Sequence, residues 1–171
     1  MKTAMPKNVE GENCASESLA TGGVPMSEAW RFEYSVECLV SRDFAWQFWT
    51  DVANWAVVDP AVESVKLDGP FAAGAKGTTK PRGSDSVEWR VTEVEDRSRA
   101  LIEMPAPGAV LRCLLTFEDS LNGGTRITQR MSLDGERAED YAWIGAEMEK
   151  GMPEGMQKLA EAIRRVAGEQ A

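Results

Sequence analysis

The residue types that could do chemistry are limited by one absence. The 171-residue sequence contains no histidine. Ser-His-Asp triads, imidazole general bases and histidine metal sites are therefore excluded, and any chemistry falls to carboxylates, Lys, Tyr or Cys. This weighs against ordinary hydrolases. We predict no catalytic residue, no metal site and no cofactor.

Gln129 and Tyr141 are the polar side chains that the sequence brings nearest to an apolar interior. Gln129 lies two positions from both Ile127 and Met131 in a predicted strand, so it shares their inward face. Its amide needs a partner in backbone, water or ligand, and a structural partner is favoured. Tyr141 stands near the start of the last apolar stripe. Its hydroxyl either orients a ligand or lies at a wet interface.

The carboxylates are weaker candidates for a functional role than Gln129 and Tyr141. Glu93 falls on the same predicted strand face as Trp89, but near the strand end, where carboxylates are usually solvated. We therefore do not predict it to be a general base. Asp51 and Asp59 are interpreted as a helix cap and a turn residue rather than as a catalytic pair.

The net charge and the cysteine spacing limit which binding partners and which cellular compartment we expect. The net charge is -9 with a pI near 4.7 and no basic cluster, which argues against nucleic acid and anionic membranes as partners. No apolar run approaches the roughly 18 residues of a membrane span, so no membrane insertion is predicted. Cys14, Cys38 and Cys113 show no paired spacing. Free thiols in a reducing compartment are expected, which favours the cytoplasm. The oligomeric state is left open.

The last long segment, 139–167, must position any ligand-facing residues. Its apolar residues recur every three or four positions, which predicts one amphipathic helix. Pro153 lacks a backbone N–H in mid-helix and is flanked by glycines, so a kink is expected there. Met148, Met152 and Met156 surround that kink, and methionine fills irregular space or adapts to varied apolar ligands. Plain core packing is the commoner role of such a stripe.

The preceding chain predicts mostly strands. Residues 1–28 lack apolar periodicity and are expected to form a disordered leader, followed by a single domain over 29–168. A strand over 30–40 is followed by two short helices capped by Ser41 and Asp51. About six further strands follow, joined by tight turns, with a short strand at 101–104 and a chain break at 105–108. Val87, Trp89 and Val91 are expected to face inward. The order predicts an α+β domain in which a curved antiparallel sheet wraps the terminal helix.

Several short motifs in order resemble a known family. They are DVANW at 51–55 with Asp59-Pro60, VKLDGP at 65–70 with Gly74, Phe117-Glu118, and GGTRIT at 123–128. Together with the Pro-interrupted terminal helix, they resemble the polyketide cyclase/dehydrase-like branch of the START-related helix-grip (SRPBCC) superfamily. The resemblance covers about Trp30 to Ala167. It implies a curved seven-stranded antiparallel sheet around a long C-terminal helix, with two short helices after the first strand.

The resemblance also implies a cavity between sheet and helix that holds a hydrophobic or aromatic small molecule. Inward strand positions and the helix stripe would supply its walls. The predicted ligand-binding residues are Trp55, Trp89, Cys113, Leu115, Gln129, Met131, Tyr141, Met148, Met152 and Met156. Each could instead be a plain core or interface residue, and only the volume of the cavity separates the two interpretations.

The sequence leaves three hypotheses for the function. The first is binding of a hydrophobic small molecule, such as a lipid, without a catalytic constellation. The alternative is a polyketide cyclase/aromatase-type enzyme, with Gln129 and Tyr141 polarising a substrate carbonyl. Cyclases of the family place an Arg with Ser or Tyr partners on pocket-facing strands, and Val87, Trp89 and Val91 offer no such group. The third is a protein-interaction role of the acidic surface and the leader.

Overall fold

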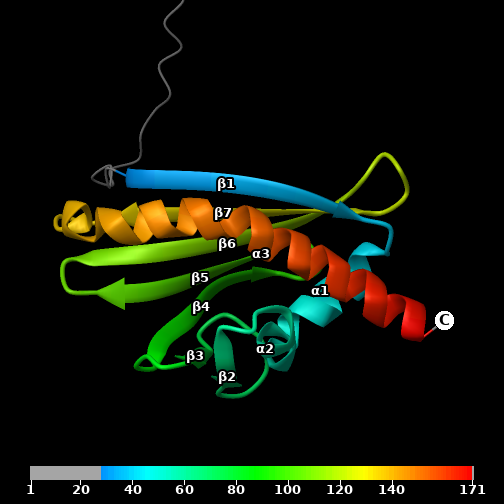
Figure 1. Cartoon of the computed structure of the whole chain (residues 1–171), viewed down its shortest axis with the longest axis horizontal. Coiled ribbons are helices and arrows are strands. Elements are labelled where there is room, and N and C mark those ends of the chain that lie inside the picture. The colour runs from blue at the N-terminus through cyan, green and yellow to red at the C-terminus, as the bar shows by residue number, and fades with distance from the viewer. Residues whose placement is uncertain (1–27, 171) are drawn as a thin grey trace, which may run out of the picture.

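Seven antiparallel strands form one sheet with the spatial order β1-β7-β6-β5-β4-β3-β2 (Figure 1). The computed structural model describes residues 28–170. The predicted seven-stranded sheet with a long C-terminal helix is confirmed. The predicted leader lies outside the described residues, except that Glu28 is the first residue of β1. The strands are β1 (Glu28–Cys38), β2 (Val62–Leu67), β3 (Lys76–Pro81), β4 (Val87–Glu95), β5 (Arg99–Ala106), β6 (Ala109–Asp119) and β7 (Thr125–Asp134).

Short helices carry the chain from one edge of the sheet to the other. β1 pairs with β7 at one edge, whereas β2 forms the opposite edge. Both predicted caps are present: the Ser41 hydroxyl accepts from the Phe44 N–H at 3.2 Å, and the Asp51 carboxylate accepts from the Ala53 N–H at 3.3 Å. The connecting elements are α1 (Arg42–Thr50), the 3-10 turn η1 (Val52–Asn54) and α2 (Trp55–Val58).

The remaining strands follow one another as antiparallel neighbours, as tight turns require. β5 is longer than the predicted 101–104 strand. Pro105 and Ala106 still pair with β6, so the predicted break over 105–108 was wrong. The turn is confined to Pro107 and Gly108, where Gly108 has a φ of 73° that favours glycine.

Two predictions about β4 were also wrong. The register shifts between Val91 and Glu93, which is a β-bulge. A bulge inserts one residue into the alternation, so Glu93 is exposed and pairs with Arg99 at 3.5 Å instead of sharing the Trp89 face. Val87 remains 42% exposed because it is the first residue of the strand, whereas Trp89 and Val91 are buried as predicted.

The last helix, α3 (Ala142–Glu169), lies across the inner face of the sheet and contains Pro153. A 3-10 turn, η2 (Ala138–Tyr141), precedes it, so the helix starts three residues later than the predicted stretch. Figure 1 shows that the axis of α3 changes direction part-way along, as the internal proline predicts. The helix packs mainly on β1, with fewer contacts to β7, α2 and α1. The strands further across the sheet, β4 to β6, therefore receive less direct cover from it.

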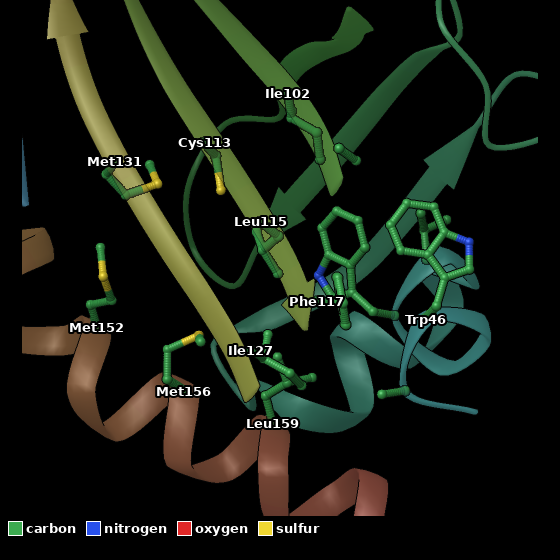
Figure 2. Close-up of a cluster of buried hydrophobic side chains, with 14 of the residues drawn as sticks. Trp46, Ile102, Cys113, Leu115, Phe117, Ile127, Met131, Met152, Met156 and Leu159 are labelled. Carbon is green, nitrogen blue, oxygen red and sulfur yellow. The ribbon is translucent and has the colours of Figure 1, made fainter. Parts of the chain in front are cut away.

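The core fills the space between sheet and helices. Phe117 and Ile127 from the sheet are almost fully buried, together with Met156 and Ile163 from α3. Figure 2 shows how side chains from the strands, α1 and α3 converge on this layer. The opposite face of the sheet is polar and carries cross-strand ion pairs, which Arg112 illustrates by pairing with Glu103 at 3.0 Å.

Candidate ligand-binding site

A cavity of about 280 Å³ lies between the sheet, the short helices and α3, and we call it the inner chamber. Its walls are almost wholly apolar, with aromatic, aliphatic and sulfur-containing side chains. Ligand pockets commonly have this composition. The lining residues are Trp49, Trp55, Val58, Asp59, Val62, Thr79, Trp89, Ile102, Met104, Cys113, Leu115, Gln129, Gly155, Met156 and Leu159.

A second hollow of about 560 Å³ runs beside the first half of α3, and we call it the outer groove. Trp143 stands on its rim and is 67% exposed. The two hollows share three lining residues, Asp59, Gln129 and Gly155. The remaining residues of the outer groove are Met131, Trp143, Ile144, Glu147, Met148, Gly151 and Met152.

Three indoles form one wall of the inner chamber. Trp55 stacks between Trp49, at 5.6 Å between ring centroids, and Trp89, at 5.1 Å. Two of the three indole N–H groups are already used: Trp55 donates to the Trp49 carbonyl at 2.8 Å, and Trp89 donates to the Thr79 hydroxyl at 3.0 Å. Trp55 and Trp89 therefore offer aromatic surface rather than free hydrogen-bond donors.

Gly77 makes the position of Trp89 possible. The two residues are register partners on β3 and β4. A Cβ atom at position 77 would lie 2.2 Å from the Trp89 ring, so any other residue would displace the indole. Gly77 thus has a packing role in the chamber wall.

Sulfur atoms surround the one amide of the site. Gln129 donates from Nε2 to Cys113 Sγ and to Met131 Sδ, both at 3.4 Å. In Figure 2, Cys113 on the sheet and Met152 and Met156 on α3 extend into the same space. Sulfur is a weak acceptor, so these contacts hold the amide only loosely.

The Cys113 thiol is not an activated nucleophile. Burial raises the pKa of Cys113 to about 12, and the hydrogen bond from Gln129 offsets only part of that rise. The thiolate is the nucleophilic form of cysteine, and at neutral pH this side chain stays protonated. Cys113 therefore acts as a polarisable wall residue.

Comparison with family models places the chain in a family. The family model described as polyketide cyclase / dehydrase and lipid transport matches residues 29–167. The chain belongs to this family. The resemblance inferred from the short motifs is thereby confirmed. No curated protein matches the chain in sequence.

Several solved structures share the fold of this chain. Norcoclaurine synthase from Thalictrum flavum, in complex with dopamine and hydroxybenzaldehyde, is 11% identical with a TM-score of 0.65, covering 92% of this chain and 99% of that one. A protein of Nitrosomonas europaea is 17% identical with a TM-score of 0.62, covering 81% and 96%. The di-domain ARO/CYC protein BexL is 16% identical with a TM-score of 0.60, covering 80% of this chain and 49% of that one. At these identities the likeness establishes the helix-grip fold alone.

Within this family fold, most of the predicted site residues do border the two hollows. Gln129 borders both. The inner chamber holds Trp55, Trp89, Cys113, Leu115 and Met156. The outer groove holds Met131, Met148 and Met152.

Tyr141 is the predicted site residue that the fold keeps away from both hollows. It belongs to η2 rather than to the regular helix, and its hydroxyl donates to the Pro107 carbonyl at 3.1 Å. The side chain thus ties η2 to the turn between β5 and β6. Its position corresponds to the interface role that the sequence had left open.

Sequence reasoning missed several wall residues. Ile102 and Met104 face the chamber from β5, and the alternation of the 101–104 segment could have indicated them. Thr79 could have been found by pairing the strand after Gly77 with the Trp89 strand. Asp59 was interpreted as a turn residue, and its carboxylate does accept from the Ala61 N–H at 2.9 Å, but it also lines both hollows.

Among residues 28–170, no group of three or more His, Cys, Asp or Glu side chains could hold a metal ion. Within the same range, none of the helices has the length and apolar character needed to cross a membrane.

Proposed function

We propose that this protein binds an apolar or aromatic small molecule in the inner chamber. One observation carries the proposal: a chamber of about 280 Å³ between sheet and α3, walled by aromatic, aliphatic and sulfur side chains. Small-molecule sites are typically concave and apolar, with a few polar groups that fix orientation. Gln129 and Thr79 supply those groups here. The family description, which includes lipid transport, agrees with an apolar cargo.

The energetics favour a flat ring beside the indole wall. Apolar surface removed from water contributes about 25 cal/mol per Å². Aromatic pairs add about 0.5–1.5 kcal/mol beyond that area. Because the N–H groups of Trp55 and Trp89 are already bonded, a ring can contact these two indoles without leaving either donor unpaired.

Thermal unfolding in the presence of 2-naphthol and of 1-dodecanol tests the proposal. A ligand at 100 times its dissociation constant should add about 2.7 kcal/mol to the free energy of unfolding and raise the midpoint. Met104→Trp fills the chamber from β5 and should abolish the shift. Leu101→Trp, on the opposite face of the same strand, is the matched control and should keep it. A wild-type midpoint that responds to neither compound would contradict the proposal.

A second function, a cyclase/aromatase-type enzyme, is favoured by one observation. Among the described side chains, the Gln129 amide donates hydrogen bonds only to sulfur atoms, which are weak acceptors, so it can turn toward a substrate carbonyl. Tyr141, its predicted partner, does not border the chamber, whereas Thr79 does and carries a hydroxyl. With a poly-β-ketone thioester as probe, wild-type protein should direct cyclisation to one product. Gln129→Leu should return the uncatalysed mixture while still binding 2-naphthol. Identical mixtures with and without wild-type protein would exclude this function.

A further inference from the structure

Two glycines in the middle of α3 have no packing reason to be glycine. A Cβ atom at Gly151 or Gly155 would meet nothing within 4 Å. Gly145 differs, because a Cβ there would lie 2.7 Å from the Trp30 ring, which explains a glycine at that position. Glycine weakens a helix interior relative to alanine. Gly151 and Gly155 therefore weaken the helix without allowing any closer contact, and both border the outer groove.

Gly155 also marks the place where the two hollows meet. It lines both of them, together with Asp59 at the end of α2 and Gln129 on β7. We call these three residues the throat. A Cβ atom at position 155 would meet nothing within 4 Å, so there is open space beside Gly155 where a large side chain could obstruct the passage between the hollows. The missing side chain thus has a role in access rather than in packing.

The charges around the throat have one sign. Among the residues that line either hollow, Asp59 and Glu147 are the charged ones, and both are acidic. One Asp59 oxygen accepts from the Ala61 N–H, and within residues 28–170 the other has no hydrogen-bond partner.

Two lysines near these carboxylates are already paired. Lys150 pairs with Glu147 at 2.9 Å, and Lys158 pairs with Glu154 at 2.7 Å. The pKa of Lys158 is raised, mainly by Glu154 and to a smaller extent by Asp59, so Lys158 lies within the field of the throat carboxylate. Neither lysine lines the inner chamber or the outer groove.

We infer that the inner chamber and the outer groove are one two-part binding site joined at the throat, and that its ligand is elongated. One flat apolar end lies against Trp55 and Trp89, a second apolar part lies in the outer groove, and the portion at the throat is an uncharged or cationic hydrogen-bonding group. Asp59 and Gln129 are the specificity-determining residues, because they can accept from an N–H or O–H and because Asp59 repels an anion. This inference rests on the proposed function.

A matched pair of fluorescent probes tests the charge preference. N-phenyl-1-naphthylamine has two aromatic parts joined by one N–H, and 1-anilinonaphthalene-8-sulfonate is the same molecule with a sulfonate beside that N–H. At low salt the neutral probe should bind about tenfold more tightly, the order expected of one carboxylate partly screened by water. Asp59→Asn keeps the acceptor for the Ala61 N–H. It should tighten the sulfonate probe several-fold and leave the neutral probe nearly unchanged.

A second pair of variants tests whether one ligand spans both hollows. Gly155→Leu should weaken N-phenyl-1-naphthylamine about tenfold by closing the throat. The same variant should leave 2-naphthol, which fits the inner chamber alone, unchanged in calorimetry. Gly155→Ala is the control, since a Cβ meets no atom there, and it should bind both compounds like wild type while unfolding at a higher temperature.

The outcomes separate the two levels of the proposal. If wild type binds neither 2-naphthol nor the long probe, the proposed function fails and this inference fails with it. If 2-naphthol binds but Gly155→Leu leaves the long probe unaffected, the binding function stands and the two-part site is overturned. A sulfonate probe that binds as tightly as the neutral one, with no response to Asp59→Asn, overturns the charge preference.

Discussion

Whether the methionine stripe lines a void or fills a closed core can be decided by one substitution, Met152→Trp. Met152 is 7% exposed and borders the outer groove of about 560 Å³, so an indole can extend into existing space. We expect the free energy of unfolding to change by no more than about 1 kcal/mol, because the added ring meets a hollow rather than packed atoms. Trp is a slightly weaker helix former than Met, and this difference accounts for roughly a few tenths of a kcal/mol of the expected change.

Ile163→Trp provides the matched control on the same helix. Ile163 is fully buried at 0% exposure and lines neither hollow. The same new side chain must there be forced into close-packed atoms, which typically costs roughly 1–3 kcal/mol and sometimes more. Both variants end with Trp in α3, so differences in intrinsic helix propensity largely cancel.

Urea unfolding followed by circular dichroism measures both variants. A constant m-value would show that the midpoint shifts report stability rather than a changed denatured state. Met152→Trp should also reduce the amount of N-phenyl-1-naphthylamine bound at saturation. A Met152→Trp protein that is as strongly destabilised as Ile163→Trp, without ligand, would refute the reasoning: the stripe would be core, and the groove would not be available to a ligand.

Further perturbations test the helix, the outer face and the chamber wall. Pro153→Ala restores one helical hydrogen bond and should raise stability by less than the roughly 3 kcal/mol of a free helix, because the bend is already accommodated, and it should lower ligand capacity. Burial would raise the pKa of Glu103, but hydrogen bonds from Arg90 and Arg112 outweigh it and lower that pKa below its ordinary 4.5. The ionised carboxylate therefore stabilises the fold at pH values above the ordinary pKa. The difference in free energy of unfolding between wild type and Glu103→Gln should shrink as the pH is lowered from about 6 to about 3. Burial raises the pKa of Cys113 to about 12, so little of its thiolate is present at about pH 8. Iodoacetamide should therefore label Cys113 on the order of a thousandfold more slowly in the native than in the urea-unfolded protein. Peptide mass spectrometry measures both labelling rates.

Local chemistry was sufficient to predict most of the elements. Ser41 and Asp51 carry short oxygen side chains just before apolar segments, and both do cap helical turns. Gly123, with a φ of 80°, occupies the hairpin turn that Asn-Gly predicts. Strict alternation placed Gln129 on the inward face of β7. These predictions succeed because each depends on contacts within a few residues along the chain.

The failures involve features that local patterns do not encode. The bulge in β4 reverses the face of Glu93, and no residue type in that segment signals where an extra residue enters the ladder. Tyr141 fits the helical period, yet η2 directs it to the Pro107 carbonyl. Asp59 looks like an ordinary turn residue, and only the approach of α2 to α3 places it beside the throat. Each of these depends on how distant segments meet.

The methionine stripe shows the same limit, and the neighbouring glycines show a way past it. Met152 and Met156 recur with helical spacing whether or not the space beneath them is filled, so their periodicity alone could not decide between core and cavity. Pro153, Gly151 and Gly155 each disfavour a helix, and a helix selected for stability alone would not concentrate them within one turn and a half. The helix persists because its two ends are held, by close contact of Gly145 with Trp30 on β1 and by burial of the segment around Ile163. The middle is thus the part of α3 that can bend and leave space, and it is the part that borders both hollows. Helix-weakening residues that have no close neighbour, placed between two anchored ends, are therefore a stronger indication of a cavity than the apolar stripe itself.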